Sequence, residues 1–209
     1  SGLVASGVGG EFVVNTNLTG NQFWPRVAAD GTLLVAWTDD PNVDFTTSEI
    51  KARVFSFDTS PPAIANLGPP PTFVEGGLAV LLDANVDISD ADLDALNGGL
   101  GNYGGAIFSV QRAGAASADD LLTFDAAALS AAGLVVSGGS DLLDSATSQI
   151  VATSLGGQPF GTGGVLGLTF SAGATSTQAD AIARAIAYAN SSSAPPGNVP
   201  LEYFFFAGD

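Results

Sequence analysis

The sequence predicts an all-β sandwich with one helix, preceded by a small N-terminal β module. Short runs of β-branched, aromatic and aliphatic residues recur along the chain, and Gly, Ser and Asp turns separate them. Only one long segment carries apolar residues at the spacing of a helix. The 209 residues are enough to bury a full core, and this length allows one large domain with a smaller companion.

Residues 1–58 are predicted to form the small β module. Its β-forming runs are residues 11–16, 32–38 and 50–58, and the Ala-Asp-Gly-Thr sequence at residues 29–32 indicates a hairpin turn. We therefore expect three or four short strands in this part of the chain.

A proline-rich segment, residues 59–72, is predicted to link the two domains. Five prolines stand between Asp58 and Thr72, and each fixes the backbone φ angle and removes a hydrogen-bond donor. We expect a stiff, extended linker with the domain boundary near Ser60. The larger domain then occupies residues 73–209.

The larger domain is predicted to be the sandwich. Its β-forming runs follow one another at short intervals, as in all-β sandwiches. They are residues 79–88, 105–113, 133–138, 148–154, 165–171 and 201–208.

The one predicted helix lies between the last two of these strands, within residues 175–192. Thr177 is a candidate N-cap, and Asp180 follows in the first turn. One face of the helix is apolar and is expected to pack on the sandwich. Its members are Ala179, Ile182, Ala183, Ile186 and Ala189.

Charge and composition exclude several functions. The chain has 21 acidic and five basic residues and a net charge of −16, so it lacks the basic clusters that nucleic acids and anionic lipids require. It has neither His nor Cys, which excludes Ser-His-Asp and Cys-His catalysis, ordinary zinc sites and disulfides. Polar residues interrupt every long apolar run, so we expect no membrane insertion. The acidic balance suits divalent cations.

The densest acidic stretch is DISDADLDAL, residues 87–96. Asp90, Asp92 and Asp94 match the first positions of an EF-hand loop, but Ala95 replaces the required Gly and Gly101 replaces the final Glu. The glycine-rich run that follows has Tyr103 where a calcium-binding nonapeptide repeat has Asp. Both motifs therefore fail. A helix start capped by Ser89, with acids in its first turn, is an alternative explanation of the stretch.

The segments FVEGGLAVLLDANVDISDADLDAL and GLTFSAGATSTQADAIARAIAYANSS, with the final EYFFFAGD, resemble a known family. They are similar to the cadherin-like repeat domains of very large secreted or surface-anchored bacterial proteins, many of them adhesins with RTX repeats. The resemblance covers residues 61–209. The preceding module looks like a short repeat that occurs in tandem in similar proteins, and here it occurs once.

The resemblance implies a cadherin-like or immunoglobulin-like β-sandwich in an extracellular or cell-surface protein. It also implies calcium as the cofactor, bound by Glu75 before the first strand and by Asp90 and Asp92 in a loop at the same end of the domain. Flexible, oxygen-rich anionic sites suit Ca²⁺ better than Mg²⁺.

Other acidic residues have competing interpretations. Asp119 and Asp120 can lie in a surface turn, which is favoured, or bind calcium, and the stretch from Asp141 to Asp144 is expected to be a solvated turn. A second, weak cation site or a flexible acidic loop is predicted for a group in the small module. Its members are Asp39, Asp40, Asp44 and Glu49.

Aromatic residues leave a second choice open. Trp24, Trp37, Phe23 and Tyr103 can stack on sugar rings or pack in the core, and core packing is favoured. Enzyme motifs are weak: an Asp-Thr-Ser-Pro stretch lacks the Gly and the second copy of an aspartic protease. A glycosidase needs only two carboxylates, so the sequence does not exclude that class.

These observations predict a non-enzymatic, calcium-rigidified structural or adhesive module. We expect it to associate with itself or with neighbouring repeats, because three or four strands bury little apolar surface alone. Residues 1–8, SGLVASGV, are a candidate donor strand for the open sheet edge expected after residue 206. The alternatives are a carbohydrate-binding module and, less favoured, a glycan-degrading enzyme.

Overall fold

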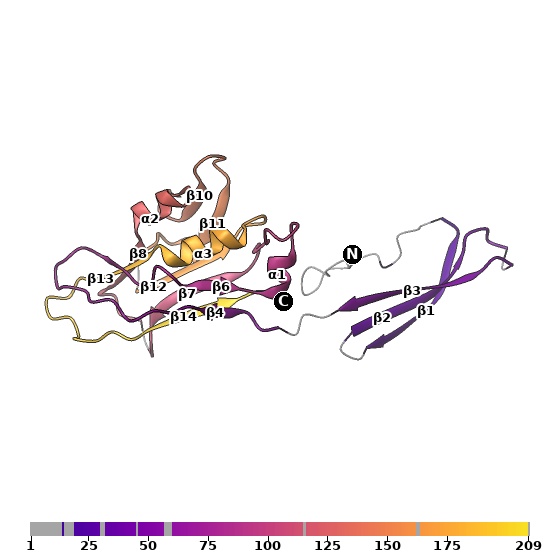
Figure 1. Ribbon diagram of the computed structural model, residues 1–209, viewed down its shortest axis with the longest axis horizontal. Helices are drawn as coiled ribbons and strands as arrows, with labels where there is room; N and C mark the ends of the chain where they lie inside the picture. Colours follow the sequence, from indigo (N-terminus) through magenta and orange to yellow (C-terminus); the bar gives the residue numbers. More distant parts are fainter. Residues whose placement is uncertain are drawn as a thin grey trace. The chain divides into compact units, whose positions relative to one another are not determined.

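The computed structural model describes residue 14 and residues 19–29, 32–44, 46–56, 60–114, 116–161 and 164–208. The chain divides into two compact units, residues 1–59 and residues 60–208, both drawn in Figure 1. The division falls at the predicted boundary near Ser60.

Among its described residues, the smaller unit contains three antiparallel strands in the order β1-β2-β3. They are β1 (Asn21–Ala29), β2 (Thr32–Asp40) and β3 (Glu49–Ser56). The β1–β2 hairpin turns at the predicted position. Strand β1 was not predicted, because Pro25 interrupts its pattern, and the structure accommodates this residue at an irregularity between Phe23 and Arg26. The predicted strand at residues 11–16 lies outside the described residues, apart from Val14.

The larger unit is built around a six-stranded antiparallel sheet in the order β14-β7-β12-β11-β10-β9. Its strands are β7 (Ile107–Arg112), β9 (Leu134–Ser137), β10 (Asp141–Asp144), β11 (Ile150–Ser154), β12 (Val165–Phe170) and β14 (Leu201–Phe206).

Two smaller antiparallel sheets accompany it. One has the order β5-β13-β8, with β5 (Val80–Leu81), β8 (Asp120–Phe124) and β13 (Ile186–Asn190). The other pairs β4 (Ala63–Ala65) with β6 (Asp87–Ser89). The helical segments are short: α1 (Ala91–Ala95), α2 (Ala126–Ala131), the 3-10 turn η1 (Leu155–Gly157) and α3 (Ser176–Arg184). The predicted all-β sandwich class is confirmed.

The core lies between these layers. Alternate residues of β7 and β12 point inward, including Phe108, Val110 and Leu168, and each is fully buried. Helix α3 covers them with the apolar face that the sequence predicts, and Ile182 is fully buried. This burial of aliphatic and aromatic side chains is the main source of stability for the larger unit.

The predicted helix is too long. It ends at Arg184, because Ala185 closes the last turn through hydrogen bonds from its N–H to helix carbonyls, and Ile186 begins β13. Ile186 and Ala189 therefore lie on a strand that pairs with β8, instead of on the helix. The N-cap is Thr175 and not Thr177. Tertiary pairing of a β-branched and aromatic segment overrides the helical spacing of its alanines.

The predicted linker at residues 59–72 also needs correction. Strand β4 lies inside it and pairs antiparallel with β6, and Ile64 packs against the core. The segment is thus partly an element of the larger unit.

Successive side chains of β14 point to opposite faces of the sheet. Tyr203 and Phe205 face the core, while Phe204 and Phe206 point outward with 47% and 59% of their surface exposed. In the described sheet, β14 pairs only with β7 and forms an edge.

Candidate functional site

The acidic stretch forms the start of helix α1. Asp90 is its N-cap, and its Oδ1 accepts hydrogen bonds from the backbone N–H groups of Asp92 (3.1 Å) and Leu93 (3.0 Å). Asp92 and Asp94 lie in the first turn, where the positive end of the helix dipole favours carboxylates. The structure therefore contains the predicted helix start, with Asp90 in place of Ser89 as the cap.

The three predicted calcium ligands are not brought together. Glu75 lies in a turn before β5, whereas Asp90 and Asp92 follow β6. Because β4 and β6 are antiparallel, the loop after β4 and the turn after β6 leave this strand pair at opposite ends. Within the described part of the chain, no three acidic side chains form a group able to hold a metal ion. Calcium binding stays a prediction from the sequence.

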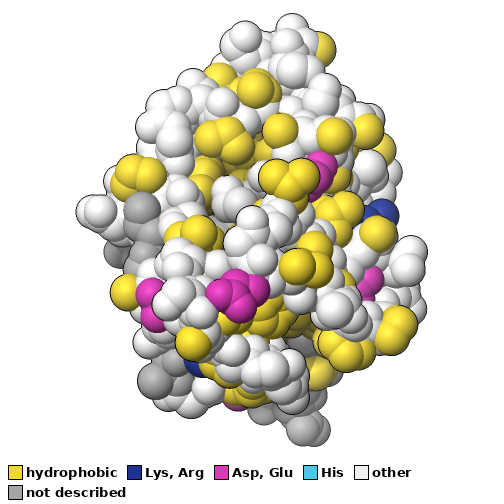
Figure 2. Space-filling view, turned by 90° about the vertical axis from the view of Figure 1, so that its left-hand side faces the viewer, with side chains coloured by type: hydrophobic (Ala, Val, Ile, Leu, Met, Phe, Trp, Pro, Cys, Tyr) yellow, Lys and Arg dark blue, Asp and Glu magenta, His cyan; other side chains and the backbone are white. Residues whose placement is uncertain are grey.

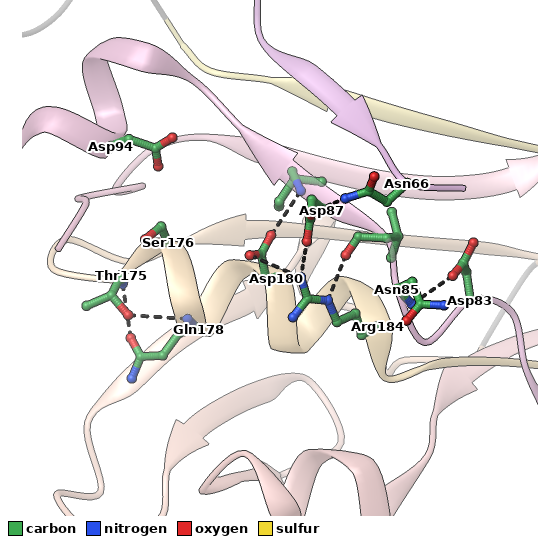
Figure 3. A network of polar contacts seen from close by, with 12 residues as sticks. Asn66, Asp83, Asn85, Asp87, Asp94, Thr175, Ser176, Gln178, Asp180 and Arg184 are labelled. Carbon is green, nitrogen blue, oxygen red and sulfur yellow. Dashed lines mark hydrogen bonds and ion pairs between the residues drawn. The ribbon is translucent and has the colours of Figure 1, made fainter. Parts of the chain in front are cut away.

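A polar network joins α3 to the β4–β6 pair, as Figure 3 shows. The Arg184 guanidinium donates to the Asp87 carboxylate and to the Val86 carbonyl, the latter at 2.9 Å. Asp180 on the same helix lies 3.4 Å from Arg184 and accepts the backbone N–H of Ile88 at 3.0 Å. The network fixes the position of α3 on the edge of the sandwich.

Tyr103 connects this network with α1. Its hydroxyl donates to Asp94 Oδ1 at 2.8 Å and lies 3.1 Å from the Ile88 carbonyl, and its ring is completely buried. In the same network, burial raises the pKa of Asp180 above its ordinary value; the hydrogen bond from Ile88 opposes this effect, and the negative charge of Asp94 adds a smaller increase. Tyr103 is therefore a core residue, and the sugar-stacking alternative does not apply to it.

The most buried charge of the larger unit is Asp120, which was predicted to lie in a solvated turn. Asp120 is completely buried on β8 and accepts two hydrogen bonds of 2.6 Å from Arg112. Tyr188 and Asn190 donate to its Oδ1 at 2.8 and 2.9 Å. The sequence signal that identifies this site is one of the few basic residues, Arg112, at the end of a neighbouring strand.

Burial alone raises the pKa of the Asp120 carboxyl, but the hydrogen bonds from Arg112 and Tyr188 outweigh that effect and hold the pKa below its ordinary value. The carboxylate stays charged and serves as a structural centre for strands β7, β8 and β13.

The stretch from Asp141 to Asp144 was also predicted to be a turn. It forms β10, and only its last residue starts a turn: Asp144 Oδ1 accepts the N–H groups of Ala146 (3.0 Å) and Thr147 (2.9 Å). Leu142 between the two aspartates is fully buried, which explains why the segment pairs as a strand.

The acidic residues of the smaller unit have separate partners. Asp39 accepts a hydrogen bond from Gln22 at 3.0 Å, and Asp44 Oδ1 accepts the N–H of Thr46 at 2.8 Å. Glu49 pairs with Lys51. The fourth carboxylate, Asp40, accepts the backbone N–H of Asp44 at 3.4 Å.

The three aromatic residues of this unit that are candidates for sugar stacking or core packing differ in their surroundings. Trp24 is 68% exposed and packs edge-to-face on Phe23, with ring centroids 4.8 Å apart, while Trp37 is half-buried. Core packing, which the sequence favoured, is therefore wrong for Trp24, whose ring lies on the surface.

Three comparisons with known proteins complete this description. The chain matches no protein-family model, no curated protein and no solved structure. None of the helices found among the described residues has both the length and the hydropathy that a membrane span requires.

Proposed function

We propose that this chain is a non-enzymatic structural or adhesive module that associates with a second copy, or with a neighbouring repeat, through its smaller unit. The observation that carries the proposal is an exposed apolar sheet face, here named the aliphatic face. It comprises Ala28, Leu34, Ala36, Ile50, Ala52 and Val54.

Strand register places these residues on one side of the sheet. Leu34 pairs directly with Ala28 on β1 and with Val54 on β3, and Ala36 pairs with Ala52. Directly opposed residues point to the same face. The exposed fractions are 37% for Leu34, 58% for Val54 and 76% for Ile50.

The other side of the sheet is covered in part, because Val27, which pairs with Val35 on this side, is 66% exposed. Val35 and Phe55 are 9% and 7% exposed, and Arg53 donates a 2.7 Å hydrogen bond to the carbonyl of Val14. A sheet needs a second layer on its apolar face to gain independent stability. Arg26 pairs with Ala36 and lies on the same face, at its β1 side. The part of the face formed by β2 and β3 consists of small and aliphatic side chains, and this part is suited to packing against a copy of itself.

The resemblance to cadherin-like repeats adds two expectations to this proposal. One is an extracellular or cell-surface location, and the other is stiffening by calcium. Neither is needed for the aliphatic face to act as a contact surface.

The proposal is tested by sedimentation of the full chain over a range of concentrations. We expect the unmodified chain to self-associate and Val54→Asp to weaken association at least tenfold, because a carboxylate in the contact loses its hydration without gaining a partner. Val43→Asp is the matched control, because Val43 is a similarly exposed valine (54%) of the same unit outside the aliphatic face. A chain that stays monomeric at every concentration contradicts self-association.

A further inference from the structure

The larger unit contains a groove of about 510 Å³ between two segments that are far apart in sequence. In Figure 1 the loop after β4 and the loop after β13 run side by side at one end of this unit. Both contribute to the groove walls: residues 67–83 supply one wall and residues 195–203 the other, with Tyr188 between them. Figure 2 looks onto this end, where hydrophobic side chains cover much of the surface and a few carboxylates lie among them.

The walls of the groove are held in place. Five of the lining residues are prolines, which have fixed φ angles: Pro70, Pro71, Pro195, Pro196 and Pro200. Asp83 accepts hydrogen bonds from the backbone N–H groups of Gly68 and Asn85, which closes one wall. Phe73 packs edge-to-face on Tyr188, with centroids 5.2 Å apart. A site held in this way loses little conformational entropy when a ligand binds.

The groove offers ring faces together with both kinds of hydrogen-bonding group. Phe73 and Tyr203 are partly exposed aromatic residues of the lining. The Tyr203 hydroxyl and the Asn198 amide can donate, and Glu75 and Asp83 can accept. Burial, with a smaller effect of the Asp83 charge, raises the pKa of Tyr203 to about 12, so this hydroxyl keeps its proton at neutral pH.

We propose that this groove binds an uncharged oligosaccharide. Sugar hydroxyls both donate and accept hydrogen bonds, so they can use the donors and the acceptors of the lining at once, while the C–H faces of the rings pack on Phe73 and the prolines. The lining contains two carboxylates and no Lys or Arg, which disfavours anionic glycans and phosphates.

A cationic, proline-rich peptide is the other ligand class that an aromatic groove with carboxylates can accept. It fits less well here. The backbone carbonyls of a peptide can accept from Tyr203 and Asn198, but each cationic side chain needs a carboxylate partner in the groove. One of the two carboxylates, Asp83, already accepts two backbone hydrogen bonds. The oligosaccharide is therefore the ligand that the lining favours.

The test begins with the full chain on an array of neutral oligosaccharides, including hexamers of glucose, mannose, xylose and N-acetylglucosamine, beside anionic glycans and arginine-bearing proline peptides. Calorimetry then measures the dissociation constant of the best neutral oligosaccharide. We expect Tyr203→Phe and Phe73→Leu each to weaken it about three- to tenfold, because each removes one hydrogen bond or one stacking contact.

Glu202→Gln is the control, because Glu202 is an exposed neighbour of Tyr203 that points to the opposite side of β14. It should leave binding unchanged, and circular dichroism checks that each variant is folded. Three results overturn the proposal: no neutral oligosaccharide binds, only anionic glycans or peptides bind, or binding is insensitive to both groove variants. Val54→Asp should retain sugar binding, so a failure of self-association does not decide this test.

Discussion

Asp90 and Asp120 are both nearly inaccessible to solvent, but their charges are stabilised differently. Asp90, which is 2% exposed, accepts two backbone N–H groups at the start of α1. Asp120 is held by three side chains from strands β7 and β13. The first arrangement is local in sequence and the second joins residues far apart. Their substitution therefore has different consequences.

Asp90→Ala removes the cap of α1. We expect the free energy of unfolding to fall by about 1 kcal/mol, the usual cost of losing an N-cap carboxylate. Chemical denaturation in excess chelator measures it, because capping needs no metal. Asp90→Asn, whose amide oxygen can still accept these N–H groups, should recover most of the loss. A cost that appears only with Ca²⁺ present would mean that Asp90 acts as an ion ligand instead.

Asp120→Asn breaks a buried ion pair and leaves Arg112 without its carboxylate. We expect a loss of about 3 kcal/mol at pH 7, the low end for such pairs, because the Arg112 side chain is 20% exposed. Since the pKa of Asp120 is lowered by folding, its contribution is present above the unfolded pKa of about 3.9 and is lost as the pH falls through the folded pKa.

The measurement for this pair is denaturation at pH 7 and again below pH 4. The difference between the unmodified chain and Asp120→Asn should shrink at the acidic pH. An equal difference at both pH values would show that the Asp120 charge does not contribute. Asp125→Asn is the control variant. Asp125 is also an aspartate, but it only caps α2, where its Oδ1 accepts the backbone N–H of Ala128 at 2.7 Å.

At the scale of elements, β14 is an edge strand of the larger unit that exposes large apolar side chains. It follows Pro200, pairs with β7 alone in the described sheet, and exposes Phe204 and Phe206. An unpaired edge with apolar side chains is a template for strand addition. The sequence predicts that residues 1–8 add as a donor strand to an open sheet edge. These residues lie outside the described residues, so the structure describes only the edge, strand β14.

Phe204→Lys places a charge beside this edge. We expect light scattering by concentrated samples to decrease, because a lysine on an edge strand opposes pairing with another strand. The midpoint of thermal unfolding should change little, since the Phe204 side chain is already 47% exposed. Phe205→Lys is the contrasting variant: its side chain packs against the core, so the fold itself should be lost or weakened. Unchanged scattering by Phe204→Lys would exclude β14 as the template.

The whole molecule combines two units with a large excess of negative charge. The net charge of −16 destabilises the compact state through self-repulsion, and bound cations reduce it. The larger unit holds most of the acidic residues, among them the predicted ligands Glu75, Asp90 and Asp92. Cation binding is therefore a property to test on the intact chain.

We expect Ca²⁺ to raise the stability of the larger unit. A cation that binds only the folded state adds about 2.7 kcal/mol at a hundred times its dissociation constant. Calorimetric melts in chelator and in millimolar Ca²⁺ measure the shift, and Asp92→Asn should reduce it. Asp144→Asn should not, because the Asp144 carboxylate is engaged in its own turn. Coincident melts in chelator and Ca²⁺ would reject the calcium prediction.

The sequence by itself determined the all-β class, the division near Ser60, most strands of the sandwich and the alternation of side chains along β14, but not which side of β14 faces the core. These features depend on short-range patterns: two-residue alternation, turn residues and the apolar face of α3. Alternation works because successive side chains of a strand point to opposite faces, whatever the strand pairs with.

Only the tertiary structure decided where α3 ends, why Asp120 is buried and which acidic residues lie together. Ile186 joins β13 because β8 offers it a pairing partner, and no local pattern shows that partner. Asp120 is buried because Arg112 and Tyr188 reach it from other strands. Glu75 is separated from Asp90 because β4 and β6 run in opposite directions. In each case the deciding contact joins residues distant in the chain, and local propensity carries no information about such contacts.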